Sequence, residues 1–187
     1  MRGTIVTATE TSLVVQTAQG PVTVGLTEKT RIVGATPGAV ADVVPGLYLG
    51  VGNIPGKVGN EAVEITIFDE KLRGNGEGFD GPWDGPVKRE GSAMTNGTVT
   101  TPKPESMTNG TVQKLDGAAG KMITMVYKDG SKKITILPST AIVHVAPGSP
   151  KLLVAKSSVY VSSLKADDGQ LCAGFIVVGE KGTVVPL

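Results

Sequence analysis

The sequence has one cysteine, Cys172, among 187 residues, so a disulfide framework is excluded. Aromatic residues make up only 4% of the chain, so valine, isoleucine, leucine and threonine must fill the interior. Three of these residue types are β-branched and favour strands. No apolar run approaches the ~20 residues of a membrane-spanning helix, and a formal net charge of +1 gives no electrostatic footprint for nucleic acid. We therefore expect a β-rich protein with no membrane insertion and no nucleic-acid partner.

The chain carries one set of landmarks twice, in the same order. The offset between the copies drifts only from roughly 107 to 112 residues. The matched landmarks are Gly3-Thr4-Ile5 with Gly110-Thr111-Val112, Thr30-Arg31-Ile32-Val33 with Thr140-Ala141-Ile142-Val143, Pro37-Gly38 with Pro147-Gly148, and Ala62 and Ile65 with Ala173 and Ile176. This order predicts an internal duplication. We expect a first β-barrel module over 1–70, a Gly/Pro-rich inter-module segment over 71–106 and a second β-barrel module over 107–187.

Short runs rich in valine and threonine, separated by turn residues, predict antiparallel strands in both modules. The first module is expected to hold strands Gly3–Ala8, Ser12–Thr17, Pro21–Leu26, Thr30–Ala35, Leu47–Val51 and Glu61–Phe68, with one helical turn over 39–44. The second is expected to hold Gly110–Leu115, Lys121–Tyr127, Lys132–Leu137, Ala141–Val145, Ser158–Leu164 and Leu171–Val178. Many short strands with almost no helix favour small barrels, because a closed sheet has no exposed edges. The predicted fold class is all-β, with two tandem OB-like or SH3-like β-barrels.

One hexapeptide occurs twice near the start of the second module. Met94-Thr95-Asn96-Gly97-Thr98-Val99 recurs without change as Met107-Thr108-Asn109-Gly110-Thr111-Val112, thirteen residues later. Only one copy can form the first strand of the second barrel, and we place that strand at the later copy. The earlier copy then lies in the inter-module segment or competes for the same edge position.

The landmarks carry a family resemblance. The duplicated Gly-Thr-Val opening, the Thr-x-Ile-Val strand followed by Pro-Gly, and the closing Ala-x-x-Ile strand resemble an uncharacterised bacterial family of exported proteins with OB-like barrel domains. Between the modules, Arg73-Gly74-x-Gly76-Glu77-Gly78 followed by Pro82-Trp83-Asp84 resembles relatives that are often labelled "metal ABC transporter permease". The resemblance implies a periplasmic β-protein of unknown activity, and it supplies no catalytic residues. Met1 is then either a native start or a replacement for a removed secretion signal.

The inter-module segment is the main candidate for a metal site. Asn75, Glu77, Asp80 and Asp84 offer oxygen ligands on a glycine-rich backbone, which suits Ca²⁺ or another divalent cation. His144 could add a nitrogen ligand, although a packed or solvent-facing strand residue is the alternative interpretation. The spacing is not that of an EF-hand, and a loop rich in glycine, aspartate and asparagine is usually only a loop.

The same segment is also the candidate binding surface. Trp83 is the only tryptophan of the chain and lies close to Phe79. Such an aromatic residue either docks its own segment into a groove between modules or anchors a partner. The predicted binding residues are Arg73, Glu77, Phe79, Trp83 and Asp84.

These features predict a function without catalysis. No nucleophile–base pair or paired acid is visible, so we expect no enzyme and no cofactor. The predicted function is a periplasmic binding or interaction module with a protein partner, an accessory subunit of a cell-envelope complex. The alternative is a periplasmic metal-binding or metal-handling protein that uses the carboxylates of the inter-module segment. The sequence leaves the oligomeric state open.

Overall fold

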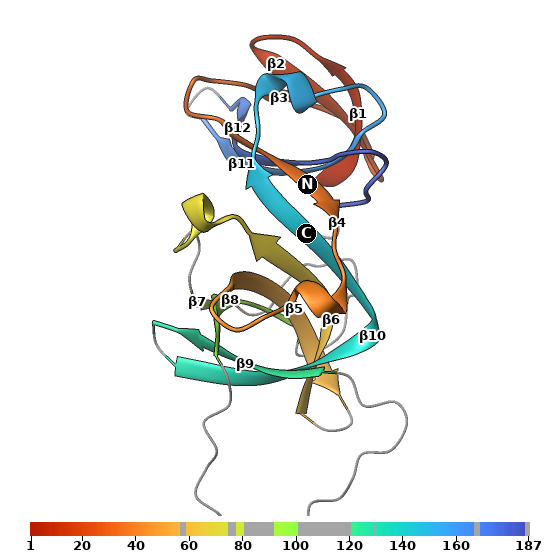
Figure 1. The fold of residues 1–187 in the computed structure, drawn as a ribbon. Coiled ribbons are helices and arrows are strands. Elements are labelled where there is room, and N and C mark those ends of the chain that lie inside the picture. Colours follow the sequence, from red (N-terminus) through yellow and green to blue (C-terminus); the bar gives the residue numbers. More distant parts are fainter. Residues whose placement is uncertain are drawn as a thin grey trace, which may run out of the picture. The chain divides into compact units, whose positions relative to one another are not determined.

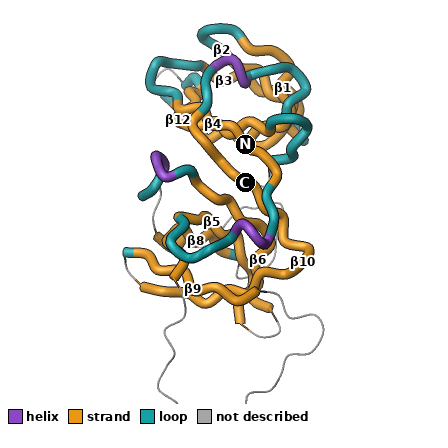
Figure 2. Tube along the Cα trace, in the orientation of Figure 1, coloured by secondary structure: helices purple, strands orange, loops and turns teal. Residues whose placement is uncertain are grey.

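The computed structural model describes residues 1–56, 59–74, 78–80, 92–100, 121–128, 130–166 and 169–185. Within these residues the fold is all-β, with twelve strands and three short 3₁₀ helices (Figures 1 and 2). In chain order the elements are β1 (Arg2–Ala8), β2 (Ser12–Thr17), β3 (Gly20–Gly25), β4 (Arg31–Pro37), η1 (Val40–Asp42), β5 (Tyr48–Gly56), β6 (Gly59–Phe68), η2 (Glu70–Leu72), β7 (Gly78–Asp80), β8 (Ala93–Thr100), β9 (Lys121–Tyr127), β10 (Gly130–Pro147), η3 (Pro150–Leu152), β11 (Ser158–Lys165) and β12 (Leu171–Gly179).

Two compact units divide the chain, and each takes strands from both halves of the sequence. Unit 1 comprises Met1–Pro37 and Val143–Val185, and unit 2 comprises Gly38–Ile142. The sequence led us to expect consecutive modules at 1–70 and 107–187. The compact units interleave the two halves instead, because the leading strands of the chain pair with its last two strands.

Unit 1 contains a closed cycle of five strands. In order around the cycle these are β1, β2, β3, β12 and β11, and β11 pairs with β1 again. The β1–β11 pairing is antiparallel, with Gly3 opposite Val159, whereas β3 and β12 run parallel where Gly25 meets Cys172. Aliphatic side chains fill the interior, as we expected from the low aromatic content of the sequence. Its fully buried residues include Ile5, Leu13, Val15, Val24, Val161 and Ile176.

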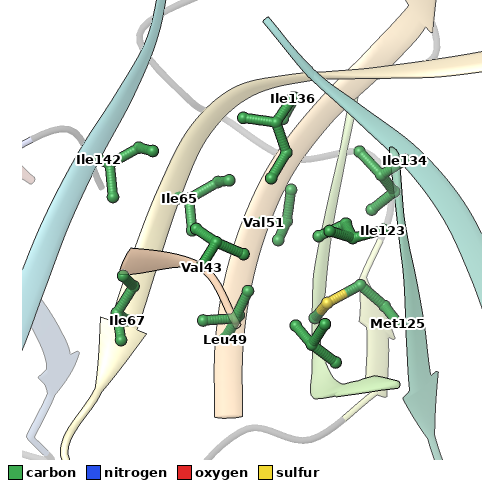
Figure 3. Packing of buried hydrophobic residues seen from close by; sticks show 12 residues of the cluster. Val43, Leu49, Val51, Ile65, Ile67, Ile123, Met125, Ile134, Ile136 and Ile142 are labelled. Carbon is green, nitrogen blue, oxygen red and sulfur yellow. The ribbon is translucent and has the colours of Figure 1, made fainter. Parts of the chain in front are cut away.

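The strands of unit 2 also pair in a cycle of five, β8, β9, β10, β6 and β5, which returns to β8. Their inward side chains form a second apolar core, seen closely in Figure 3. It includes Leu49, Val51, Ile65, Ile123, Met125, Ile134 and Ile136. The short strand β7 pairs with the other edge of β8, where Gly78 lies opposite Asn96.

The threonine of the Thr-x-Ile-Val motif has the same role in each unit. Thr30 Oγ1 accepts from the Thr27 amide and donates to the Ala173 carbonyl, at 2.9 and 2.7 Å. Thr140 Oγ1 accepts from the Leu137 amide and donates to the Ala62 carbonyl, at 3.0 and 2.9 Å. The motif therefore marks a hydroxyl that joins a turn to a neighbouring strand.

Around Thr140 the expected strand boundaries were wrong. We expected Lys132–Leu137 and Ala141–Val145 to be separate strands, but both belong to the single long strand β10. In the middle of this strand, the hydroxyl of Thr140 bonds to the Leu137 amide and to the Ala62 carbonyl of β6.

The Pro-Gly landmarks and the turns that follow them also match between the units. The Gly38 amide donates to the Ile142 carbonyl, and the Gly148 amide donates to the Ile32 carbonyl, both at 2.9 Å. Further along, Gly46 has a φ of 91°. The corresponding turn in unit 1 places a lysine, Lys156, in the same region at 71°.

The strand of unit 2 that corresponds to β1 is β8, and β8 contains the earlier copy of the hexapeptide, Met94–Val99. The Val99 amide donates to the Leu47 carbonyl, and the Gly46 amide donates to the Val99 carbonyl. In unit 1 the residue with the matching bonds is Ile5 of β1, which receives a bond from Lys156. The strand that we expected at Gly110–Leu115 lies outside the described residues. In the described part of the chain, no helix has the length and apolar character needed to cross a membrane.

Candidate functional site

Arg73, the first predicted binding residue, follows the short helix η2. The side chain of Asp69 caps this helix by accepting from the Lys71 amide, and Leu72 is buried beneath it. These contacts fix the direction in which the chain leaves β6. As a result, Arg73 lies over the outer face of β5 and β8.

The guanidinium of Arg73 is engaged on several sides by groups of its own unit. It donates to Thr98 Oγ1 at 2.9 Å and to the Gly46 carbonyl at 2.8 Å. It also pairs with both carboxylate oxygens of Glu70 and lies 5.8 Å from the centre of the Tyr48 ring. The hydrogen bond from Arg73 lowers the pKa of the Glu70 carboxyl; partial desolvation opposes this and the Arg73 charge adds to it. Arg73 therefore anchors the chain after β6 to β5 and β8.

The other predicted site residues lie on other strands or outside the residues that the structure describes. Phe79 and Asp80 belong to β7, opposite Thr95 and Met94. His144 lies in the part of β10 that belongs to unit 1, opposite Thr36 of β4. The remaining predicted residues, Asn75, Glu77, Trp83 and Asp84, lie outside the described residues.

The metal hypothesis stays a prediction. Among the side chains that the structure describes, no group of three or more His, Cys, Asp and Glu is placed to hold a metal ion. A calcium titration followed by thermal unfolding would test the site, because a cation that binds the folded state raises its melting temperature.

A pocket of about 240 Å³ opens at one end of the unit 1 barrel. Three segments form its wall: the β1–β2 turn, the turn between β3 and β4, and the start of η3. Two exposed carboxylates, Glu10 and Glu28, contribute to the lining. The other lining residues are Thr9, Leu26, Thr27, Thr30, Ile32, Gly148, Ser149 and Pro150.

Backbone and hydroxyl bonds hold the turns that carry the two glutamates. The Leu26 amide donates to the Thr11 carbonyl at 2.8 Å, which ties the turn with Glu10 to the end of β3. The turn with Glu28 is closed by the bonds between Thr27 and Thr30. The acidic rim is therefore held on a hydrogen-bonded frame.

The pocket lining combines two carboxylates with apolar side chains. Leu26 and Ile32 supply apolar surface, and Pro150 adds more at the start of η3. Glu10 and Glu28 can accept hydrogen bonds from a cationic ligand. The arrangement suits an ammonium or guanidinium group carried on an aliphatic stem.

The sequence reasoning did not identify Glu10 and Glu28. They lie in different turns, eighteen positions apart, and match no motif. A signal did exist, because in a β1–β2–β3 meander the β1–β2 turn and the end of β3 lie at the same end of the sheet. Applied to the predicted strands, that rule would have brought the two glutamates together.

Comparison with known proteins adds no relative to this picture. No protein-family model, no curated protein and no solved structure matches the chain.

Proposed function

We propose that this protein is a non-enzymatic periplasmic binding module, an accessory subunit of a cell-envelope complex. In this proposal the unit 1 pocket receives a lysine or arginine side chain of a protein partner. The observation that carries it is that Glu10 and Glu28 line the same pocket, together with the apolar side chains of Leu26 and Ile32. The resemblance to an exported bacterial family supports the periplasmic location.

The size of the pocket favours a single side chain over a larger ligand. Its volume of about 240 Å³ is below the ~300–1,000 Å³ of pockets that enclose drug-sized molecules. A lysine or arginine stem can cover Leu26 and Ile32 while its charged end remains near the rim. Since both glutamates are exposed, the charges contribute more to orientation and association rate than to affinity.

The proposal includes an OB-like fold for each unit and their origin in an internal duplication. The antiparallel order β1–β2–β3, with β12 parallel to β3 and β11 closing the cycle, supports an OB-like barrel. The matching bonds of Thr30 with Thr140 and of Gly38 with Gly148 support the duplication. Each barrel would then combine the leading strands of one copy with the last two strands of the other.

Ligand binding can be tested with two small probes that differ by one charged group. Lysine and norleucine, each acetylated at the α-amino group and amidated at the carboxyl group, share an aliphatic stem, but only lysine has the ammonium. Titration of the lysine probe should shift the amide resonances of Thr27 and Thr30, and the norleucine probe should shift them much less. Equal shifts with both probes, or none at tens of millimolar, would contradict the proposal.

The partner can be tested in the native envelope with a matched pair of proteins. Wild type and the double variant Glu10→Gln/Glu28→Gln have nearly the same shape and differ in charge at the rim. A partner cross-linked by wild type and lost with the variant would support the pocket as the interface. Recovery of an uncomplexed monomer in both cases would count against the role as an accessory subunit.

A further inference from the structure

The two units carry complementary surfaces, an acidic pocket on unit 1 and a basic, partly apolar sheet face on unit 2. We propose that the unit 1 pocket of one copy receives Lys133 from the sheet face of a second copy, so that this chain is its own partner. The inference rests on the proposed function, because it names the protein partner whose lysine enters the pocket.

The sheet face, called the β9–β10 face below, is the outer side of the hairpin that these two strands form in unit 2 (Figure 1). Side chains alternate along a strand, and Ile123, Met125 and Ile134 point into the apolar core. The residues that alternate with them therefore point outward. These are Met122, Thr124 and Val126 on β9, with Thr135, Lys133 and Ser131 opposite them on β10.

Two apolar side chains of the β9–β10 face are open to solvent. Met122 is 52% exposed and Val126 is 40% exposed. Lys133 is also exposed and lies opposite Thr124, the residue midway between them. Diagonal neighbours in a sheet are within reach of a long side chain. The lysine therefore stands between two apolar contacts, which suits entry into a pocket that combines carboxylates with apolar side chains.

The charge of the β9–β10 face is positive. The strands β8, β9 and β10 contain no aspartate or glutamate, whereas β9 and β10 contain Lys121, Lys132 and Lys133. On the neighbouring strand β6, Glu61 has its carboxyl group against Gly56 of β5. The unit 1 pocket is opposite in character, since its lining includes two glutamates and no lysine or arginine. Charge therefore favours contact between the two surfaces and disfavours contact of either one with itself.

The equivalent hairpin of unit 1, formed by β2 and β3, lacks these features. Val15 and Met125 occupy matching places in the two hairpins, since they lie opposite Ile5 and Val99. Counted from this match, Ser12, Gln16 and Thr23 are the unit 1 counterparts of Met122, Val126 and Lys133. Of the two hairpins, only that of unit 2 combines a lysine with exposed apolar side chains on its outer face.

Contact between two different surfaces has a consequence for assembly. A copy whose pocket is filled still offers its own β9–β10 face to another copy, so association continues head to tail. It stops when a ring closes, and the smallest ring is a dimer with two such contacts. Because the charged groups lie at exposed positions, each contact is expected to be weak and sensitive to salt.

Analytical ultracentrifugation of the full chain tests self-association. At low salt, we expect the sedimentation coefficient to rise as the protein concentration is raised from roughly 10 μM to roughly 1 mM. The rise should be much smaller in about 1 M NaCl, which screens exposed charges. A sedimentation coefficient of a monomer over the whole concentration range would overturn the inference.

Two charge variants identify the surfaces. Glu28→Lys in the pocket and Lys133→Glu on the β9–β10 face should each weaken self-association by about tenfold or more. A mixture of the two variants brings an intact pocket and an intact face together on different chains, so association should return. Lys128→Glu is the matched control, because it makes the same charge change at an exposed position beyond the face. It should weaken association by less than about twofold.

Two further variants test the apolar contacts without a change of charge. Met122→Ser and Val126→Gln give the β9–β10 face the residues of the unit 1 hairpin. Each should weaken self-association by about threefold or more, because apolar surface would no longer be buried in the contact. Unchanged association in both variants would show that the contact does not use this face.

The lysine-probe titration separates this inference from the proposed function. If the lysine probe binds but the chain stays monomeric, the inference is overturned and the proposed function stands. Self-association that is unaffected by Glu28→Lys and Lys133→Glu also overturns it, since the copies would then meet through other surfaces. A lysine probe that does not bind contradicts the proposed function and this inference together.

Discussion

Unit 1 and unit 2 share a pattern of bonds but differ in what they bury. Among the described residues, unit 1 buries the polar side chains Thr17 and Thr183. Unit 2 buries Asn53, Glu64, Thr66, Ser92, Thr95 and Thr140. Buried polar groups are costly unless they are hydrogen-bonded. The buried hydrogen bonds that Asn53 and Thr140 donate are therefore expected to contribute more to the stability of unit 2, and close apolar and backbone packing more to that of unit 1.

Matched positions show where the two units diverge. Glu64 lies opposite Gly52 in β5, and the corresponding pair in unit 1 is Phe175 opposite Ser162. Both pairs stand beside an irregularity in the register, so the backbone is similar and the side chains differ. The same backbone pairing thus carries a glutamate in unit 2 and a phenylalanine in unit 1.

The largest effect is expected from Gly3→Ala in unit 1. A Cβ atom at this position would lie 2.0 Å from the Gln16 carbonyl oxygen, which belongs to the backbone and cannot move aside cheaply. We expect a loss of about 3 kcal/mol or more in the free energy of unfolding, measured by urea denaturation.

Gly174→Ala is the matched control for Gly3→Ala. The new Cβ atom would be 3.9 Å from the Ser162 carbonyl oxygen, an ordinary van der Waals distance, so this variant should be close to neutral. Equal stability of the two variants would refute the packing argument.

The next largest effect is expected from Asn53→Ala in unit 2. The side-chain nitrogen of Asn53 donates to the Val51 and Ala93 carbonyls and to Thr95 Oγ1, all in a buried place. Truncation removes these three buried hydrogen bonds and should cost about 2 kcal/mol.

Ser163 occupies the corresponding position in unit 1, also opposite an alanine of the neighbouring strand. It is only partly buried, so Ser163→Ala should change the free energy of unfolding by less than about 0.5 kcal/mol. Similar losses for both substitutions would mean that the units do not differ in their dependence on polar contacts.

Thr30→Val and Thr140→Val test what the units share. Each substitution keeps the shape and removes a hydroxyl that makes two hydrogen bonds. We expect each to cost about 1–2 kcal/mol in thermal or chemical unfolding. Thr→Ser at either position keeps the hydroxyl and should recover most of the loss. A neutral result at one position alone would break the equivalence of the two motifs.

The smallest effect is expected from Glu70→Gln in unit 2. Arg73 lowers the folded-state pKa of Glu70 below its ordinary value of 4.5. The stabilisation is therefore fully present above the unfolded pKa and is lost as pH falls through the lowered, folded pKa. Melting curves of wild type and variant should differ slightly at pH 7 and converge in acid. A difference between the two melting curves that is the same at pH 7 and in acid would contradict this account.

The sequence predicted the strands more accurately than their pairing. Lys121–Tyr127 and Ser12–Thr17 were predicted residue for residue, because alternating apolar residues mark a strand locally. Which strands close a barrel depends on contacts such as Gly3 with Val159, far apart in the chain. Local periodicity carries no information on that choice, so the interleaving of the units could not be read from the sequence.

The choice between the two hexapeptides shows a similar limit. Identical residues give identical local preferences, so we placed the strand by its offset from the first module. The structure places Met94–Val99 in β8, where buried Ser92 and Ala93 precede it. For the pocket, the turns of Glu10 and Glu28 were predicted from the strands around them, but no motif linked the two residues.

The interleaving of unit 1 imposes an order on biosynthesis. The ribosome releases the chain from its amino end, and residues 1–37 emerge long before their partners in β11 and β12. At ~5–20 residues per second, the stretch Val143–Val185 takes about 2–9 s to make after unit 2 is complete. During that time β1 has an open edge that can pair with other chains. A chaperone that shields the nascent amino-terminal strands would therefore help this protein more than one that acts on the finished chain.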